Sequence, residues 1–171
     1  MTGPRGGRGG PRRAAPVLAP ALPEDRDALV ALANESIPVG HRAAVREFLA
    51  ESLADPDASE ERCVVARDRE GGALTGFALF GFVAGATGAG RIRAVAVTPL
   101  ARRRGVGRGL LETAVAELRD DGARFVVAEV PDEDEMGYFT LLLEACGFSE
   151  EGRAADLVRD GVAMRYVFRR F

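Results

Sequence analysis

One segment near the middle of the chain constrains the fold more than any other. Residues 94–97 are all apolar and predict a buried strand, and residues 98–104 follow with a proline and three consecutive arginines. A helix is predicted from Gly105 to about Arg119, because its apolar residues recur every three to four positions and share one face. A strand that passes through a short turn into an amphipathic helix needs a sheet on which that helix can pack.

Hydrophobic periodicity predicts further strands and helices on both sides of this segment. In chain order we expect a strand at 17–19, helices from 23 to about 34 and at 41–53, strands at 62–67, 73–84 and 91–97, the helix at 105–119, a strand at 125–130, a helix at 137–146 and a last strand at 162–168. This order predicts a mixed sheet with helices packed against it.

Length and composition predict one folded domain, residues 17–171, behind a tail. The 171 residues are 47% hydrophobic, which is enough for one core. Residues 1–16 consist mainly of Gly, Pro and Arg, a composition typical of a disordered segment. The formal net charge is −3, and the tail holds four arginines, so the domain is more acidic still and nucleic acid is not an expected partner. Two Arg-Gly-Gly runs in the tail leave RNA binding as an alternative.

The sequence favours a soluble, cytoplasmic protein. Residues 73–90 carry no charge, but five glycines interrupt them, so a buried strand ending in a hairpin is a better interpretation than a membrane span. Three prolines break the apolar stretch behind the basic N-terminus, which is a poor signal peptide. Cys63 and Cys146 are too few for a disulfide framework and predict buried thiols in a reducing compartment.

The turn before the central helix has the features of an anion site. The first amides of a helix are unpaired and carry partial positive charge, which suits phosphate. Glycine lets the backbone approach a ligand closely, and four arginines within residues 102–108 add charge and forked donors. A solvated basic patch on a capped turn is the alternative, but four arginines on an acidic domain favour an anion site.

Residues 97–111 resemble the acetyl-CoA motif of the GCN5-related N-acetyltransferases (GNAT), R-x-x-G-x-G followed by a helix. The order of elements extends the resemblance over residues 17–171. It implies an α+β fold with a mixed, mostly antiparallel central sheet and helices on both faces, acetyl-CoA as co-substrate and no metal. In the family a bulge parts the central strands, and the pantetheine arm lies in the slot. The residues implied to bind the coenzyme are Val95, Ala96, Val97, Arg102, Arg103, Arg104, Gly105, Val106, Gly107 and Arg108.

A second family motif is altered in this chain. Residues 143–148 are similar to the family's Y-E-x-x-G-F, but Leu143 stands where a tyrosine commonly protonates the departing thiolate. Met136 stands where an asparagine often contacts the coenzyme. Residues 152–164 resemble the last hairpin of ribosomal-protein and small-amine acetyltransferases.

Glu129 and Tyr138 are the candidate catalytic residues. Glu129 interrupts an apolar strand, and its setting resembles that of the glutamate base of protein N-terminal acetyltransferases. Amine attack on a thioester requires loss of a proton, which a carboxylate can accept. The alternative is an ion pair of Glu129 with Arg91 or Arg93. Tyr138 could donate a proton, or it could be a core or rim aromatic.

Other polar residues are weaker candidates. His41 reads as a solvated residue at a helix start, and Cys146 has no histidine near it in sequence to activate it as a nucleophile. The acidic run at 132–135 reads as a solvated loop, although the family geometry would let it attract a cationic amine.

These observations predict an acetyl-CoA-dependent N-acetyltransferase acting on an amine of a small molecule, a cationic one included, or of a protein N-terminus. An acetyl-CoA-binding regulatory module without turnover is the alternative, suggested by Leu143 and Met136. The sequence leaves open which amine is the acceptor and whether the protein is a homodimer.

Overall fold

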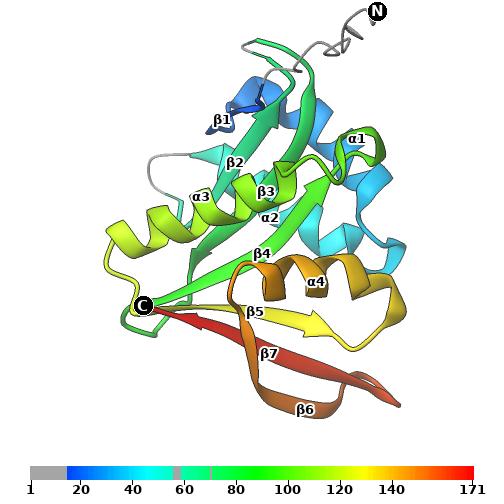
Figure 1. The fold of residues 1–171 in the computed structure, drawn as a ribbon, viewed down its shortest axis with the longest axis vertical. Coiled ribbons are helices and arrows are strands. Elements are labelled where there is room, and N and C mark those ends of the chain that lie inside the picture. The colour runs from blue at the N-terminus through cyan, green and yellow to red at the C-terminus, as the bar shows by residue number, and fades with distance from the viewer. Residues whose placement is uncertain (1–14, 56–58, 70) are drawn as a thin grey trace, which may run out of the picture.

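The computed structural model describes residues 15–55, 59–69 and 71–171 (Figure 1). Within them, seven strands form one sheet: β1 (Val17–Pro20), β2 (Glu61–Arg67), β3 (Leu74–Phe82), β4 (Ala89–Val97), β5 (Phe125–Pro131), β6 (Ser149–Arg159) and β7 (Val162–Arg170). The four α-helices are α1 (Arg26–Ser36), α2 (Arg42–Ala54), α3 (Val106–Asp120) and α4 (Gly137–Ala145). The tail expected at 1–16 lies outside the described residues except for its last two positions.

The sheet is mixed and mostly antiparallel, as expected. Its order is β1-β2-β3-β4-β5-β7-β6, and β4 with β5 is the one parallel pair among the described strands. Two parallel strands require a crossover connection, and helix α3 supplies it between β4 and β5.

Helices cover both faces of the sheet, and the alternation of side chains along each strand separates two cores (Figure 1). Helices α1 and α2 bury Leu29 and Leu49 against one face. Helices α3 and α4 bury Leu110 and Leu143 against the other. The predicted helices therefore exist, with bounds that differ from the predicted ones by a few residues.

Strands β4 and β5 part halfway along their length. Their pairing runs through four residue pairs and ends at Ile92 opposite Ala128. At this point β4 has a bulge, since Leu79 of β3 faces Ala94 while Phe80 faces Ile92, which leaves Arg93 as the extra residue. Beyond it no residue of β5 pairs with Ala94 or its successors in the described sheet. We call the open space between these strand ends the seam.

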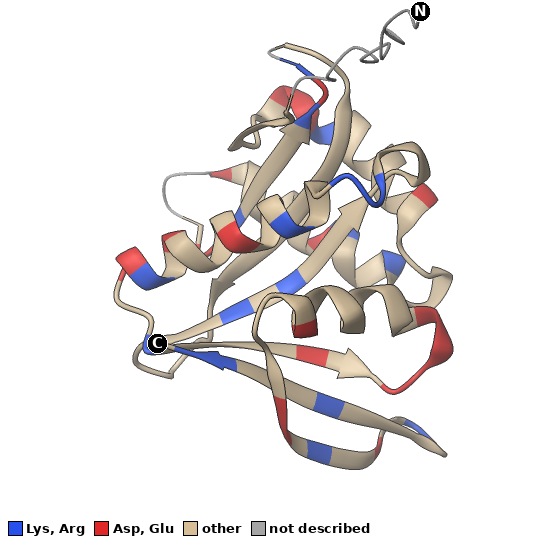
Figure 2. Ribbon diagram, viewed as in Figure 1, with Lys and Arg blue, Asp and Glu red and all other residues tan. Residues whose placement is uncertain are grey.

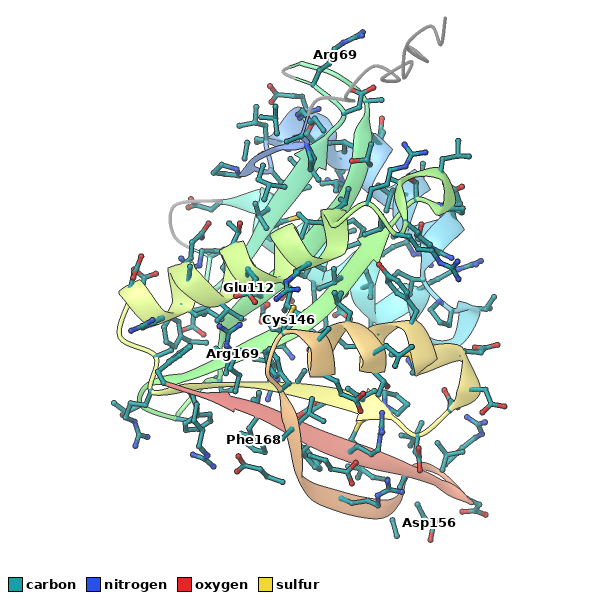
Figure 3. The ribbon with its side chains drawn as sticks, in the orientation of Figure 1. Arg69, Glu112, Cys146, Asp156, Phe168 and Arg169 are labelled. Carbon is teal, nitrogen blue, oxygen red and sulfur yellow. The ribbon has the colours of Figure 1, made fainter. Side chains whose placement is uncertain are left out.

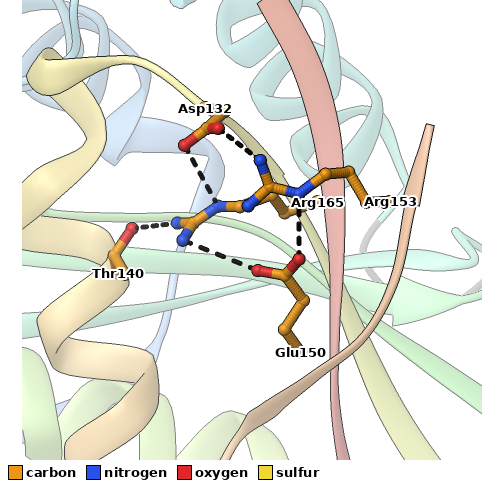
Figure 4. Close-up of polar contacts among 5 residues, drawn as sticks. All are labelled: Asp132, Thr140, Glu150, Arg153 and Arg165. Carbon is orange, nitrogen blue, oxygen red and sulfur yellow. Dashed lines mark hydrogen bonds and ion pairs between the residues drawn. The ribbon is translucent and has the colours of Figure 1, made fainter. Parts of the chain in front are cut away.

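Strand β6 is missing from the element order that periodicity predicted, whereas the resemblance of residues 152–164 to a family hairpin agrees with it. Ser149–Arg159 forms an edge strand that pairs with β7. Periodicity missed it because its side chains are mostly polar and exposed. Backbone pairing with β7 holds it, and polar contacts around the two strands add to this pairing. In Figure 4, Arg165 of β7 donates to Thr140 of α4 at 2.6 Å, and Arg153 of β6 donates to Asp132 at 2.7 Å.

A second set of polar contacts ties the C-terminal strands to α3. Arg169 Nη1 of β7 donates to Glu112 Oε2 at 2.8 Å, and Cys146 lies near this pair (Figure 3). Cys63 and Cys146 are both free and buried, as predicted, and burial raises the pKa of each thiol. Among the described residues, no helix is long and apolar enough to cross a membrane.

Candidate active site

The turn before α3 leaves its backbone amides open. Gly105 caps the helix in the left-handed region with φ of 80°, a conformation that glycine adopts at little cost. Gly109 N–H donates to the Gly105 carbonyl, which begins the helical ladder. Within the described residues, none of the amides from Arg103 to Arg108 has a backbone or side-chain acceptor. These amides, together with the helix dipole, form a nest of donors suited to an anion.

Three consecutive arginines occupy this turn (Figure 2). Arg102 Nε donates to the Val97 carbonyl at 3.1 Å, which fixes the start of the turn. Arg103, Arg104 and Arg108 are exposed, and no carboxylate pairs with them in the part of the chain that the structure describes. Their charges are therefore available to a ligand.

The end of β4 presents part of its backbone to the seam. Thr98 N–H donates to the Thr75 carbonyl near the start of β3. Because antiparallel ladders alternate, Ala96 directs its N–H and C=O to β3, whereas Val95 and Val97 direct theirs toward the seam. The contact of Arg102 with the Val97 carbonyl agrees with this direction. Of the three strand residues expected to contact the coenzyme, two therefore have backbone groups facing the seam.

A cavity of about 510 Å³ opens between α1, α2, the parted strands and the start of α4. Its wall includes Val95 and Arg102 from the coenzyme side and both predicted catalytic residues, Glu129 and Tyr138. Val95 and Glu129, which are 34 positions apart in sequence, thus line one space where β4 and β5 part.

Glu129 lies just past the last pair between β4 and β5, on the face covered by α1 and α2. Its carboxylate is 38% exposed, and Oε1 lies 3.5 Å from Nη2 of Arg91. The ion pair expected as an alternative therefore exists, and Glu129 also lines the cavity. The other arginine considered, Arg93, pairs instead with the buried Glu61 through two donor atoms.

Tyr138 bridges the cavity and the turn. A Cβ placed on Gly107 would lie 2.9 Å from the Tyr138 hydroxyl, and the Arg102 guanidinium lies 5.6 Å from the centre of the tyrosine ring. Burial raises the pKa of Tyr138 and Arg102 opposes that effect. The phenol is therefore protonated near neutral pH, with its hydroxyl beside the first turn of α3.

The two altered family positions differ in environment. Leu143 is 1% exposed and packs in the core between α4 and the sheet, so its side chain has no access to the cavity. Met136 is half-buried and lines the cavity wall.

The acidic run after β5 (Figure 2) is mostly exposed, but ion pairs hold its first two residues. Asp132 pairs with Arg153, and Glu133 pairs with Arg159 and with His41 at 3.3 Å. Both contacts lower the pKa of the Glu133 carboxyl. His41 is thus a hydrogen-bonding residue at the cavity wall rather than a solvated one. No group of three metal-ligating side chains occurs among the described residues.

Sequence reasoning missed three polar residues of the cavity, Glu35, Ser36 and Arg42. Each follows an ordinary helical pattern at the junction of α1 and α2, so no local signal marks them. Only the tertiary structure brings this junction to the parted strands.

The comparisons agree with this geometry. The model of the acetyltransferase (GNAT) family matches residues 27–148, which is more than half of the chain, and the chain therefore belongs to this family. No curated protein matches the sequence significantly. Solved structures are similar in fold at low sequence identity. A protein assigned to the GNAT family from Desulfovibrio desulfuricans superposes with a TM-score of 0.83 at 22% identity, over 91% of this chain and 99% of that one.

Two further structures superpose over most of their length. The ribosomal-protein-S18-alanine N-acetyltransferase of Escherichia coli has a TM-score of 0.70 at 16% identity, covering 91% of this chain and 94% of its own. The YncA protein of Salmonella typhimurium, solved with its cofactor acetyl-CoA, has a TM-score of 0.66 at 19% identity, covering 92% and 94%. The GNAT fold is therefore shown by family and structure together.

Proposed function

We propose that this protein transfers the acetyl group of acetyl-CoA to an amine. The observation that carries the proposal is the order of three features along the parted strands. The open amides before α3 come first, the backbone of Val95 and Val97 at the seam comes next, and Glu129 in the cavity comes last. A pyrophosphate, a pantetheine arm and an acceptor amine have matching chemistry in that order.

The residues present fit the coenzyme. The amides from Arg103 to Arg108 would hold the pyrophosphate, with the exposed arginines adding charge. Val95 and Val97 would offer hydrogen bonds to the amides of the pantetheine arm, as a neighbouring strand does. Arg102 would fix the start of the turn through its hydrogen bond to the Val97 carbonyl.

Deprotonation of the amine is the step that this protein must assist. Bound acetyl-CoA supplies a thioester whose carbonyl carbon accepts the amine and whose thiolate, of pKa about 8.5, departs. An alkylammonium has a pKa of about 10.4 and has no free electron pair until it loses its proton. Glu129 would take that proton at the amine nitrogen, directly or through one water, while Arg91 holds the carboxylate in position.

Tyr138 has two proposed roles. Its hydroxyl lies beside Gly107, so it would donate a hydrogen bond to the coenzyme at the turn. Because its pKa is raised, it would also retain a proton to give to the departing thiolate. The position beside Gly107 favours the first role, since the turn is where the phosphates would lie.

Release of free CoA in the presence of a panel of amines tests the proposal, together with mass spectrometry of the products. We expect an acetylated amine and stoichiometric CoA. Tight binding of acetyl-CoA with no acetylated product from any amine would instead favour the regulatory module.

A further inference from the structure

The junction of α1 and α2 holds an arginine, Arg42, whose two terminal guanidinium nitrogens have no carboxylate partner in the described residues. Arg42 Nε donates to the Ile37 carbonyl at 2.7 Å, which fixes the guanidinium against the cavity wall. No carboxylate pairs with Arg42 in the described residues, whereas Arg91 has Glu129 and Arg93 has Glu61. Two of its nitrogens are therefore oriented and unused, a geometry that suits a carboxylate.

A second unused donor lies beside it. Ser36 precedes Ile37 in sequence and lines the same cavity. Its hydroxyl is buried and has no hydrogen-bond partner among the described residues. A buried hydroxyl without a partner is costly to the fold, and a rotation of the Ser36 side chain toward the cavity would let a ligand satisfy it.

The rest of the wall adds two restrictions on the ligand. Phe48, Met136 and Met164 give it apolar surface, and the two methionines can adapt to the shape of a side chain. Four arginines line the cavity against three glutamates, which opposes a ligand with several positive charges. Glu129, which lies 3.5 Å from Arg91 and is partly exposed, is the carboxylate that would face a single ammonium group.

We propose that the acceptor is a small amino carboxylate with an apolar side chain, an α-amino acid of the phenylalanine or methionine type. Its carboxylate binds the Arg42 guanidinium and the Ser36 hydroxyl, and its amine faces Glu129. This inference rests on the proposed function, because it assigns the acceptor of the same cavity.

Matched acceptors test the carboxylate directly. We would measure kcat/KM for L-phenylalanine, L-phenylalaninamide and phenethylamine, with spermidine as a polycation. The amine of phenylalanine is more acidic than that of phenethylamine and less acidic than that of its amide. A preference for the acid over both comparators therefore cannot arise from amine ionisation. We expect a preference of about 10- to 100-fold, which is the value of one charged hydrogen-bonded contact.

Substitutions at the α1–α2 junction test which residue causes the preference for the acid over the two comparators. Arg42→Gln should remove it by lowering kcat/KM for phenylalanine about 10- to 100-fold while the two comparators change less than about twofold. Arg46→Gln, one turn along α2 on an exposed position outside the cavity, is the matched control and should retain the preference. Ser36→Ala should leave the melting temperature unchanged or raise it, because it removes a hydroxyl without a partner, yet lower kcat/KM for phenylalanine about 2- to 10-fold.

Each result decides. Equal losses on all three acceptors in Arg42→Gln, or acetylation of amines without any preference for the acid, would overturn the inference and leave the proposed function standing. If no amine is acetylated, the proposed function fails. Calorimetry of L-phenylalanine binding in the presence of CoA then tests the carboxylate-binding role of Arg42 separately from catalysis. If L-phenylalanine binds and Arg42→Gln weakens the binding, the inference is supported. If L-phenylalanine does not bind, the inference is overturned.

Discussion

The proposed coenzyme side and the proposed acceptor side of the cavity are built from different parts of the polypeptide. At the turn before α3, the groups that face the ligand are backbone amides, which any residue supplies once Gly105 sets the conformation. On the acceptor side, the facing groups are side chains such as Glu129 and Arg42, which come from strands and helices distant in sequence. A backbone site depends on a local pattern, and a side-chain site depends on the whole fold.

The contrast predicts different sensitivities. Substitutions at the turn should affect the affinity for acetyl-CoA and spare the choice of acceptor. Substitutions on the acceptor side should change the choice or turnover of the acceptor and leave the affinity for acetyl-CoA unchanged. The experiments below separate the two sides, starting with the largest expected effect.

Gly107→Asp and Gly105→Asp should reduce acetyl-CoA affinity by about 100-fold or more, because each places a negative charge among several charge-assisted hydrogen bonds to phosphate. At Gly107 the new Cβ also meets the Tyr138 hydroxyl at 2.9 Å, and at Gly105 it is strained by the positive φ. Isothermal calorimetry measures the affinity. Gly152→Asp on β6, where a Cβ meets its nearest neighbour at 3.9 Å, adds the same charge elsewhere and should change nothing. Unchanged affinity in both turn variants would remove the coenzyme assignment.

Glu129→Gln should lower kcat about 10²- to 10⁴-fold at pH 7, the usual contribution of a general base. Raising the pH should restore part of the loss, because more of the amine is then neutral without help. Acetyl-CoA affinity should stay the same. Glu47→Gln, on an exposed position of α2 outside the cavity, controls for loss of a carboxylate. Full activity of Glu129→Gln at every pH would assign deprotonation to water or to the acceptor itself.

Tyr138→Phe should weaken acetyl-CoA binding about 2- to 10-fold, the effect of one neutral hydrogen bond. Since burial raises the pKa of Tyr138, the phenol stays protonated between pH 7 and 9, and the effect should be constant over that range. Tyr166→Phe, at the other tyrosine of the chain, should leave the affinity unchanged. A fall in kcat with unchanged affinity would favour proton donation to the thiolate instead.

Glu133→Gln should give the smallest effect, a slight decrease in melting temperature at pH 7. The contacts with Arg159 and His41 lower the pKa of Glu133, so their stabilisation is present above the ordinary carboxyl pKa and is lost as the pH falls through the folded-state value. Wild type and variant should therefore converge in acid. A difference in melting temperature that persists at low pH would show that packing, not charge, connects these residues.

The same contrast explains what the sequence could predict. The turn before α3 and its glycines were identifiable because a strand, a basic turn and an amphipathic helix are adjacent in sequence. The apolar strands and the helices followed from periodicity. Strand β6 did not, because backbone pairing with β7 and ion pairs to Asp132 and Arg170, rather than an apolar face, hold it to the sheet. The partner of Glu129 was narrowed to Arg91 or Arg93, but only the bulge in β4 decides which side chain reaches it.

The seam also divides the molecule for local unfolding. Four residue pairs connect β4 to β5, whereas β3–β4 and β5–β7 are paired along nearly their full lengths. Each half thus has its own continuous ladder, and the junction between them is the shortest in the middle of the sheet. Native-state hydrogen exchange should accordingly reveal two cooperative units, one ending at β4 and one comprising β5, β7, β6 and α4, with separate opening free energies. A ligand lying along the seam would contact both units, so its binding should make their opening free energies more nearly equal.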